Sequence, residues 1–225
     1  MNLLKTKLKY TSEIKAGGTP STNNDDYWNG SIPWIDSGKV KYKIVKEEHV
    51  EKFISEDALH ETSTCLIKKD SPILAITGAT CSSIAYLNFD STINQSILGF
   101  HVNNNCYSKY IYYLLLSLKD QILCLRSGGA QGGVTKTDVE NIEVMIHDKT
   151  NQVIIARYLD YKTNKIDELI EKIEKKIELL KEQRTSLINQ CVTKGLDPNV
   201  QMKDSGFEWI GEIPKHWDIV KSSYL

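Results

Sequence analysis

A regular stripe of apolar residues between Arg157 and Cys191 constrains this chain most. After Ile166 the positions of the stripe alternate in steps of three and four residues, with the polar Arg184 at one of them, which is the spacing of a coiled-coil helix. At about 1.5 Å per residue, a helix of this length would extend over roughly 54 Å, more than a domain needs for its own core. The sequence therefore predicts a spacer or dimerisation helix. Its stripe comprises Leu159, Ile166, Ile170, Ile173, Ile177, Leu180, Leu187 and Cys191.

The remaining sequence predicts an α+β fold. With 225 residues, of which 40% are hydrophobic, the chain is able to bury one core besides the helix. Short apolar runs at 71–76 and 83–87 lie between turn signals and predict strands, whereas 109–125 has helical spacing. We expect a mixed α/β domain over 1–148, the long helix over 149–197 and a short final segment over 198–225.

Composition bounds the compartment and the chemistry. No apolar run is long enough to span a membrane and the first residues lack the core of a signal peptide, so we expect a cytoplasmic protein without membrane contact. The five cysteines and five histidines lack the spacing of a metal site. We interpret the cysteines as reduced and mostly buried, and the histidines as surface or packing residues.

The final segment contains two tryptophans, Trp209 and Trp217, and is too short to fold alone. The sequence of its end, residues 217–225, weakly resembles that of residues 3–10 at the chain start. Such a similarity is expected if this end is the beginning of a truncated second repeat. We interpret these tryptophans, like Trp28 and Trp34, as packing residues rather than platforms for stacked bases.

Several motifs, taken in their order along the chain, resemble one family. They are Gly-Gly-Thr-Pro-Ser at 17–21, the segment 27–35, Asn94-Gln95, Ser-Gly-Gly-Ala-Gln at 127–131, the helix start at 152–159, and the aromatic segment 206–217. Together they resemble the specificity subunits of type I restriction-modification systems, in a half-length form with one target-recognition domain. The residues 144–152 depart from that pattern, because the family usually has a proline-rich apolar segment there. Two extra glycines, Gly132 and Gly133, also lengthen the loop after Gln131.

This resemblance implies a DNA-recognition subunit without catalytic activity of its own. Residues 1–148 would be the target-recognition domain that reads one half of a bipartite site in double-stranded DNA. Modification (methyltransferase) subunits and a restriction subunit would be the partners, and S-adenosylmethionine would be the cofactor of the modification subunit, not of this chain. A homodimer through the long helix, with antiparallel helices, would supply two such domains.

The net charge of the chain limits how it is able to bind DNA. The formal net charge is −1, whereas DNA-binding proteins usually carry a basic excess that neutralises phosphates. Any DNA surface must therefore be local or shared with a basic partner.

Two segments are the principal candidates for DNA contact. The Gly-Gly-Thr-Pro-Ser turn is able to present the hydroxyls of Thr19 and Ser21 to a phosphate, although a structural turn between two strands is the interpretation that these five residues favour. In the glycine-rich loop, Gln131 is suited to an adenine edge, and Arg126 or Lys136 to phosphate or guanine. A flexible surface loop explains the second segment equally well.

Weaker candidates are the hydroxyls of Thr77 and Thr80, for which an ordinary turn is favoured. The lysines Lys39, Lys41 and Lys43 alternate as they would on one face of a strand, and they predict either a phosphate track or a solvated strand face.

Two other classes of function stay open on the sequence. A small DNA-modifying enzyme, a methyltransferase or a nuclease, would show turnover by the isolated chain with S-adenosylmethionine or Mg²⁺. A coiled-coil adaptor without a DNA role would show no DNA affinity even with partners present. The phosphate-binding loop of a translocating motor is absent from the sequence.

Overall fold

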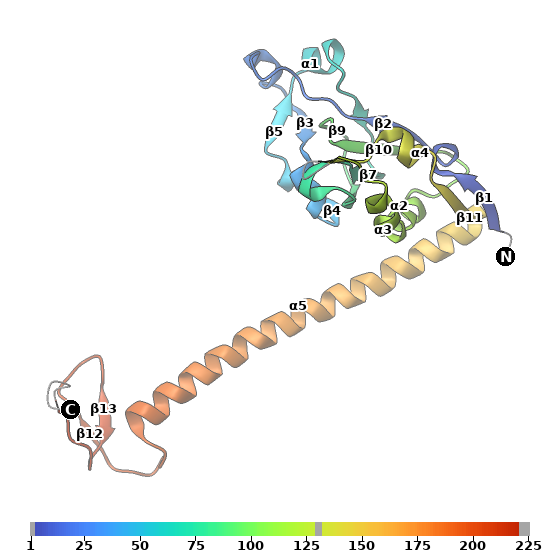
Figure 1. Ribbon diagram of the computed structural model, residues 1–225. Coiled ribbons are helices and arrows are strands. Elements are labelled where there is room, and N and C mark those ends of the chain that lie inside the picture. The colour runs from blue at the N-terminus through green and yellow to red at the C-terminus, as the bar shows by residue number, and fades with distance from the viewer. Residues whose placement is uncertain (1–2, 129–131, 221–225) are drawn as a thin grey trace. The chain divides into compact units, whose positions relative to one another are not determined.

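The computed structural model describes residues 3–128 and 132–220, which group into two compact units with a boundary between residues 161 and 162. The first unit holds most of the strands, and the long helix α5 (Lys149–Lys194) starts in the first unit and continues into the second (Figure 1). A mixed α/β domain followed by a long helix confirms the predicted fold class. The domain boundary proposed at residue 148 stays a prediction.

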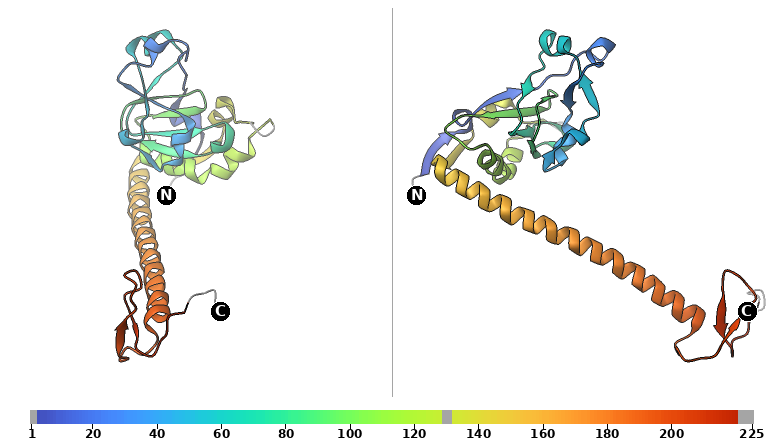
Figure 2. Two further views of the ribbon diagram at one scale, coloured as in Figure 1. Left: turned by 90° about the vertical axis from the view of Figure 1, so that its left-hand side faces the viewer. Right: turned by 180° about the vertical axis from the view of Figure 1, so that it is seen from behind.

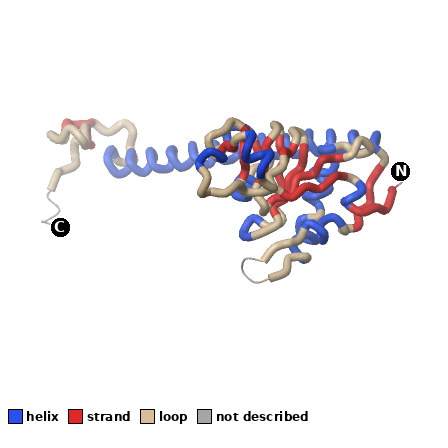
Figure 3. The backbone as a smooth tube through the Cα atoms, turned by 90° about the horizontal axis from the view of Figure 1, so that it is seen from above, coloured by secondary structure: helices blue, strands red, loops and turns tan. Residues whose placement is uncertain are grey.

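The first unit is built mainly on two sheets, whose strands are drawn in red in Figure 3. The five-stranded sheet has the order β2-β10-β7-β8-β4, and the four-stranded sheet has the order β5-β3-β9-β6. The strands are β2 (Ser12–Ala16), β3 (Ile32–Ile35), β4 (Ile44–Val45), β5 (Lys52–Ile54), β6 (Leu66–Ile67), β7 (Ser71–Ala75), β8 (Ile84–Leu87), β9 (Ser91–Ile93) and β10 (Ile97–Val102). A separate pair is formed by β1 (Leu3–Lys7) and β11 (Glu143–His147).

Helices fill the connections between these strands. The α-helices of the first unit before α5 are α1 (Glu56–Glu61), α2 (Ser108–Ser117), α3 (Lys119–Cys124) and α4 (Lys136–Glu140). The 3-10 helices are η1 (Leu8–Tyr10), η2 (Asp25–Tyr27), η3 (Ser37–Lys41), η4 (Glu47–His49) and η5 (Gly78–Thr80).

The central strand β7 contributes to two of the three clusters of buried side chains found among the described residues. All five of its residues are buried, and successive side chains of a strand point to opposite faces. Leu74 belongs to the cluster that includes Ile111 and Leu115 of α2, whereas Ile73 belongs to the cluster that reaches the four-stranded sheet. The predicted strands at 71–76 and 83–87 are thus confirmed as β7 and β8.

The predicted helix 109–125 is wrong as a single helix, because it divides at Leu118 into α2 and α3. There the N–H of Leu118 is shared between the carbonyls of Leu114 and Leu115, and the Ser117 hydroxyl donates to the Leu114 carbonyl at 2.7 Å. This tightened last turn ends α2, and Ile122 of α3 returns to the core.

The start of α5 is fixed to the first unit by a buried glutamine. Gln152 is 1% exposed; its Oε1 accepts from the Tyr107 N–H at 2.8 Å and its Nε2 donates to the His147 carbonyl at 2.7 Å. The Asp148 carboxylate accepts from the N–H of Asn151 at 3.0 Å, so it caps the helix. These bonds tie the first turn of α5 to β11 and to the start of α2.

A second attachment lies about two turns further along α5. Asp160 accepts from the Tyr113 hydroxyl at 2.7 Å and lies 3.6 Å from the Lys109 ammonium. The same ammonium stands 4.4 Å from the centre of the Tyr86 ring. Helix α2 therefore holds α5 at two points within the first unit.

The second unit contains the rest of α5 and a small hairpin, β12 (Met202–Asp204) and β13 (Glu212–Pro214), which Figure 2 shows near the red end of the chain. Gly195 ends the helix with a φ of 81°, and a Cβ there would meet the Trp217 ring at 3.5 Å. Left-handed backbone favours glycine at this position.

Candidate nucleic-acid interface

The strand register gathers the candidate residues at one end of the five-stranded sheet. Ala16 pairs with Leu98, Ile97 pairs with Ala75, and Leu74 pairs with Ile84. Strands β2 and β7 therefore end where β10 and β8 begin. Strand β4 is parallel to β8 and starts at the same end.

The segments that leave these strand ends form what we call the loop edge, defined as residues 17–21, 36–43, 77–83, 94–96 and the described parts of 126–136. Helix η3 packs against η5, Thr77 pairs with Gly133, and the Ser96 carbonyl accepts from the Ile76 N–H at 2.9 Å. At the opposite end of the sheet lie η1 and the β1–β11 pair, because Ser12 at the start of β2 pairs with Val102 at the end of β10.

The Gly-Gly-Thr-Pro-Ser turn is packed against its own chain. A Cβ on Gly17 would lie 2.1 Å from the Ile93 carbonyl oxygen, and one on Gly18 would lie 2.8 Å from the Thr64 nitrogen. The two glycines are therefore needed for close approach to this chain's own backbone, not to a partner. This agrees with the structural turn that the sequence favoured, between β2 and β3.

Thr19 and Ser21 are exposed on this turn. The Thr19 hydroxyl donates to the Oε1 of Gln95, while the Ser21 hydroxyl accepts from the Asn23 N–H at 3.4 Å. Both hydroxyls remain on the surface, so their predicted contact with DNA stays a prediction. Gln95, which belongs to the Asn94-Gln95 motif, lies on the same edge.

The three lysines at 39, 41 and 43 do not alternate on a strand, so that part of the prediction is wrong. Residues 37–41 form η3, because the Asp36 carboxylate accepts from the Gly38 N–H at 2.7 Å and starts a 3-10 turn. Lys39 is paired with Glu51; this hydrogen bond raises the pKa of Lys39 and lowers that of Glu51. Lys41 and Lys43 are exposed.

The turn at 77–80 is η5, between β7 and β8. Gly78 has a φ of 69°, a conformation that explains glycine at this position. The Thr80 hydroxyl reaches the Thr77 carbonyl at 3.5 Å. Thr77 and Thr80 thus lie on the loop edge, in the ordinary turn that the sequence favoured.

The glycine-rich loop is closed at its base beside Thr77. Ser127 and Gly133 exchange two backbone hydrogen bonds of 3.0 Å, and the Val134 N–H donates to the Ile76 carbonyl at 2.8 Å. Arg126 donates from Nε to the Gly132 carbonyl at 2.9 Å. Gln131 lies outside the described residues, so its predicted contact with a base stays untested.

Lys136 is the first residue of α4. Thr135 and Asp138 form a reciprocal capping box at this helix start, and the Lys136 ammonium lies 3.5 Å from the Glu140 carboxylate. The Lys136 side chain is 45% exposed. Its ion pair is therefore a surface pair that a phosphate is able to replace at little cost.

The predicted stripe on α5 is helical and open to solvent. All residues from 164 to 190 are exposed, and the predicted stripe positions Ile166, Ile170, Ile173, Ile177, Leu180 and Leu187 are each 47–59% exposed. Contiguous exposed apolar surface of this kind marks interaction sites in proteins.

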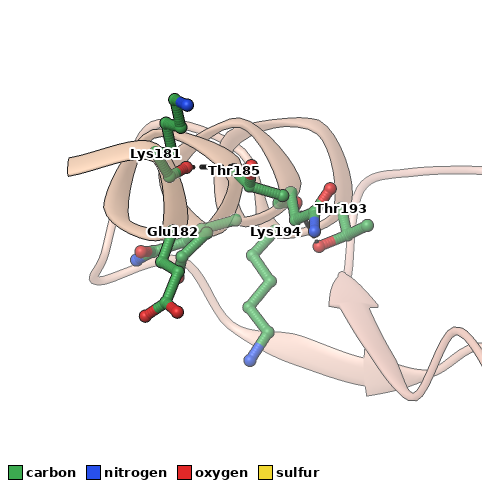
Figure 4. Close-up of a pocket in the computed structure, with 8 residues that line it drawn as sticks. Lys181, Glu182, Thr185, Thr193 and Lys194 are labelled. Carbon is green, nitrogen blue, oxygen red and sulfur yellow. Dashed lines mark hydrogen bonds between the residues drawn. The ribbon is translucent and has the colours of Figure 1, made fainter. Parts of the chain in front are cut away.

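Polar side chains occupy another face of the same helix (Figure 4). Its last turns carry Lys181, Glu182, Thr185, Ser186, Asn189, Gln190, Thr193 and Lys194 around a hollow of about 760 Å³. The hydroxyls of Thr185 and Thr193 donate to the carbonyls four residues earlier, at 3.0 and 2.7 Å. These bonds satisfy the hydroxyls within the helix, and the hollow is an open helix face rather than an enclosed cavity.

The burial of several other residues differs from expectation. Of the five cysteines only Cys81 is buried and Cys124 is exposed, so the interpretation of mostly buried thiols is wrong. Trp28 and Trp34 pack edge to face at 5.1 Å, whereas Trp209 is 85% exposed and does not pack. A tryptophan contributes to packing only where its neighbours surround it, which the sequence does not determine.

In the described ranges, no three His, Cys, Asp or Glu side chains group as metal ligands would. Among the same described residues, none of the helices is both long enough and apolar enough to span a membrane.

Comparisons with known proteins identify the family. Residues 5–179 match the profile of the type I restriction modification DNA specificity domain. The chain belongs to this family. The resemblance inferred from the motifs is thereby confirmed.

Named relatives agree with this assignment. The chain is 27% identical over 220 residues to the type I restriction enzyme MjaIX specificity subunit of Methanocaldococcus jannaschii, covering 95% of this chain and 49% of the relative. It is 27% identical over 173 residues to the EcoR124I/EcoR124II specificity subunit of Escherichia coli, covering 74% and 42%. The chain thus spans about half the length of the curated relatives that it matches.

Solved structures share the fold. A chain from a type I R-M system, studied for complex assembly and conformational transition, matches with a TM-score of 0.72 and 14% identity, over 86% of this chain and 46% of that one. The type I restriction-modification S subunit from M. genitalium matches with a TM-score of 0.55 and 16% identity, over 92% and 53%.

Proposed function

We propose that the loop edge reads one half of a bipartite DNA site, and that the chain directs partner modification and restriction subunits to that site as their specificity subunit. The observation that carries the proposal is the convergence of separate segments on one sheet end, in a chain that belongs to the DNA specificity domain family. Loops held by a rigid scaffold are the usual place for recognition residues.

The charges of the edge fit a protein that positions itself by a few phosphate contacts. Lys41 and Lys43 are exposed there, and the cationic groups of Lys39 and Lys136 are partnered by surface carboxylates. Phosphate contacts set the register on the duplex, while polar groups on the loops read base edges. A near-neutral chain with a small local cationic surface should bind weakly alone and more strongly with its partners.

In this proposal the chain has no catalytic role. The modification partner brings S-adenosylmethionine, extracts the target adenine from the duplex and methylates it. The setting is the cytoplasm, where DNA and the partner subunits meet.

Two copies of the chain would pair through α5 in the proposed assembly. Supporting it are the six apolar stripe residues, all exposed and spaced as a coiled-coil seam. An antiparallel pair has two-fold symmetry, so the two DNA-reading surfaces would be related by that axis. The target should then be an interrupted palindrome, with half-sites roughly 34–36 Å apart if they are one helical turn apart.

The test is selection from randomised duplex DNA by the chain in complex with its modification partner, followed by methylation assays with S-adenosylmethionine. We expect a defined bipartite motif from the complex, none from the partner alone, and no methyl transfer by the chain alone. A complex that methylates without sequence preference would refute the recognition role. Turnover by the isolated chain would favour the enzyme alternative, and absence of DNA affinity in the complex would favour the adaptor alternative.

The alternative to a homodimer is an assembly in which this chain pairs with a different specificity chain. Methylome mapping in a cell with this chain as the sole specificity chain tests the homodimer. An asymmetric bipartite motif there would contradict the homodimer.

A further inference from the structure

One exposed polar side chain on the loop edge is held in a defined orientation by a residue far away in the sequence. Gln95 lies at the tip of the turn between β9 and β10 and is exposed. The Thr19 hydroxyl donates to its Oε1 across 76 positions of sequence. Gln95 was not among the residues that the sequence singled out for DNA contact.

Hydrogen bonds hold the backbone on both sides of Gln95. The Asn94 side chain accepts from the Ser96 N–H at 3.1 Å, and the Asn94 N–H donates to the Ile35 carbonyl at 2.9 Å. The Asn94 carbonyl accepts from the Ile97 N–H at 3.1 Å. These three hydrogen bonds hold the turn on both sides of Gln95, so they fix the backbone position from which its side chain extends.

The bond from Thr19 is not needed to hold the two segments together. Backbone hydrogen bonds already join them, from the Gly17 N–H to the Ile97 carbonyl at 3.1 Å and from the Gly18 N–H to the Ile93 carbonyl at 2.9 Å. A side-chain bond between two exposed residues adds little stability beside these, because water competes for both groups. What the bond does is orient the amide.

The orientation has a chemical consequence. A glutamine amide has an acceptor oxygen and an NH₂ group with two donors. Since Oε1 is engaged by the Thr19 hydroxyl, the donor end is the part of the amide best placed for an external acceptor. Acceptors on the major-groove edge of DNA are N7 and O6 of guanine, N7 of adenine and O4 of thymine.

We propose that Gln95 is a specificity-determining residue whose Nε2 donates to an acceptor on a base edge, and that Thr19 is the residue that positions it. A phosphate is the less suitable acceptor, because a neutral amide releases no counterion and offers no charge-assisted bond. Preorganisation by Thr19 lowers the entropy lost when the side chain is fixed on DNA. This inference rests on the proposed DNA-recognition function.

The experiment compares variants by selection from randomised duplex DNA, each as the full chain in complex with the modification partner. Gln95→Ala removes the whole amide. Gln95→Glu is the sharper variant, because it keeps an acceptor for the Thr19 hydroxyl but replaces the donors with a second acceptor. Thr19→Val removes the orienting hydroxyl, and Thr19→Ser restores it.

We expect Gln95→Ala to lower discrimination at one position of the motif by on the order of tenfold and to leave the other positions unchanged, since about 1.4 kcal/mol of discrimination corresponds to tenfold. Gln95→Glu should change the preferred base at that same position toward cytosine, whose N4 is a donor. Thr19→Val should weaken the discrimination between bases at that position, and Thr19→Ser should restore it.

Unchanged discrimination at every position in both Gln95 variants would overturn the inference while leaving the proposed function intact. Uniform loss across all positions would also overturn it, because it would show a role in affinity or folding alone. A wild-type complex that selects no sequence would refute the proposed function and this inference with it. Thermal unfolding of each variant checks the fold, and Gln95→Glu should unfold close to the wild-type temperature because the residue is exposed.

Discussion

The buried glutamine at the start of α5 gives a prediction whose magnitude follows from the structure. Gln152→Ala removes a side chain that is 1% exposed. The change leaves the Tyr107 N–H and the His147 carbonyl without the bonds of 2.8 and 2.7 Å that they now make. It also removes one of the two attachments between the long helix and α2, together with the side-chain bond to β11.

The expected cost is about 2–4 kcal/mol of unfolding free energy. Each lost bond leaves a partly buried main-chain group unsatisfied, at roughly 1–3 kcal/mol, and water entering the vacated space offsets part of that. For a unit of this size, roughly 2–4 °C in melting temperature correspond to each kcal/mol, so the midpoint should fall by about 4–16 °C.

Urea unfolding followed by tryptophan fluorescence measures this, because Trp28 and Trp34 lie within the first unit. Gln190→Ala is the matched control, since it makes the same substitution on the same helix at an exposed position. The control should stay within about 0.5 kcal/mol of wild type. If Gln152→Ala were as stable as Gln190→Ala, the reasoning about the helix attachment would be refuted.

Three further outcomes follow from the same structure. Replacing Ile173 and Ile177 by Asp should dissociate a homodimer while the first unit stays folded, because burying unpaired charges costs several kcal/mol; an unaltered dimer in sedimentation would place the interface elsewhere. Asp160→Ala should cost about 1–2 kcal/mol in urea unfolding, because it removes the acceptor of a tyrosine hydroxyl and the partner of an ammonium; wild-type stability would contradict that attachment. Hydrogen bonds from Asn151 lower the pKa of the Asp148 carboxyl below its usual 3.8, so its cap stabilises the fold above about pH 4 and is lost as the pH falls through the lowered pKa. The stability advantage of wild type over Asp148→Ala at about pH 6 should therefore shrink at about pH 3, and an undiminished advantage would show that the carboxylate is not the cap.

Periodic patterns predicted the long helix and the central strands correctly, because their apolar spacing is a local property of the sequence. The stripe from Ile166 to Leu187 requires a helix to form one face. Within the run at 71–76, residues 71–75 form the fully buried strand β7, as its nearly continuous apolar composition indicates.

Local sequence patterns gave wrong predictions where a single polar contact determines the backbone conformation. Lys39, Lys41 and Lys43 have strand-like spacing, yet the Asp36 carboxylate starts a 3-10 turn instead. The break at Leu118 likewise depends on a shared hydrogen bond, which spacing does not reveal.

The sequence did not predict the loop edge, because this surface depends on how strands from distant parts of the chain pair with one another. Thr19, Thr77 and Gln95 are separated by up to 76 positions, and only the pairing of β2, β10 and β7 brings them to one sheet end. Their motifs were visible in the sequence, but their shared position was not.

The central claim, that the loop edge faces DNA, is tested most directly by the salt dependence of binding. Lys41 is exposed at the loop edge, and Lys9 is exposed near the opposite end of the sheet, in η1. Each is replaced by Ala, and the affinity of the complex with its modification partner for its DNA target is measured across a series of salt concentrations. We predict that Lys41→Ala flattens the slope of log affinity against log salt by about one unit, whereas Lys9→Ala leaves it unchanged. A slope reduced by Lys9→Ala and unaffected by Lys41→Ala would contradict the account.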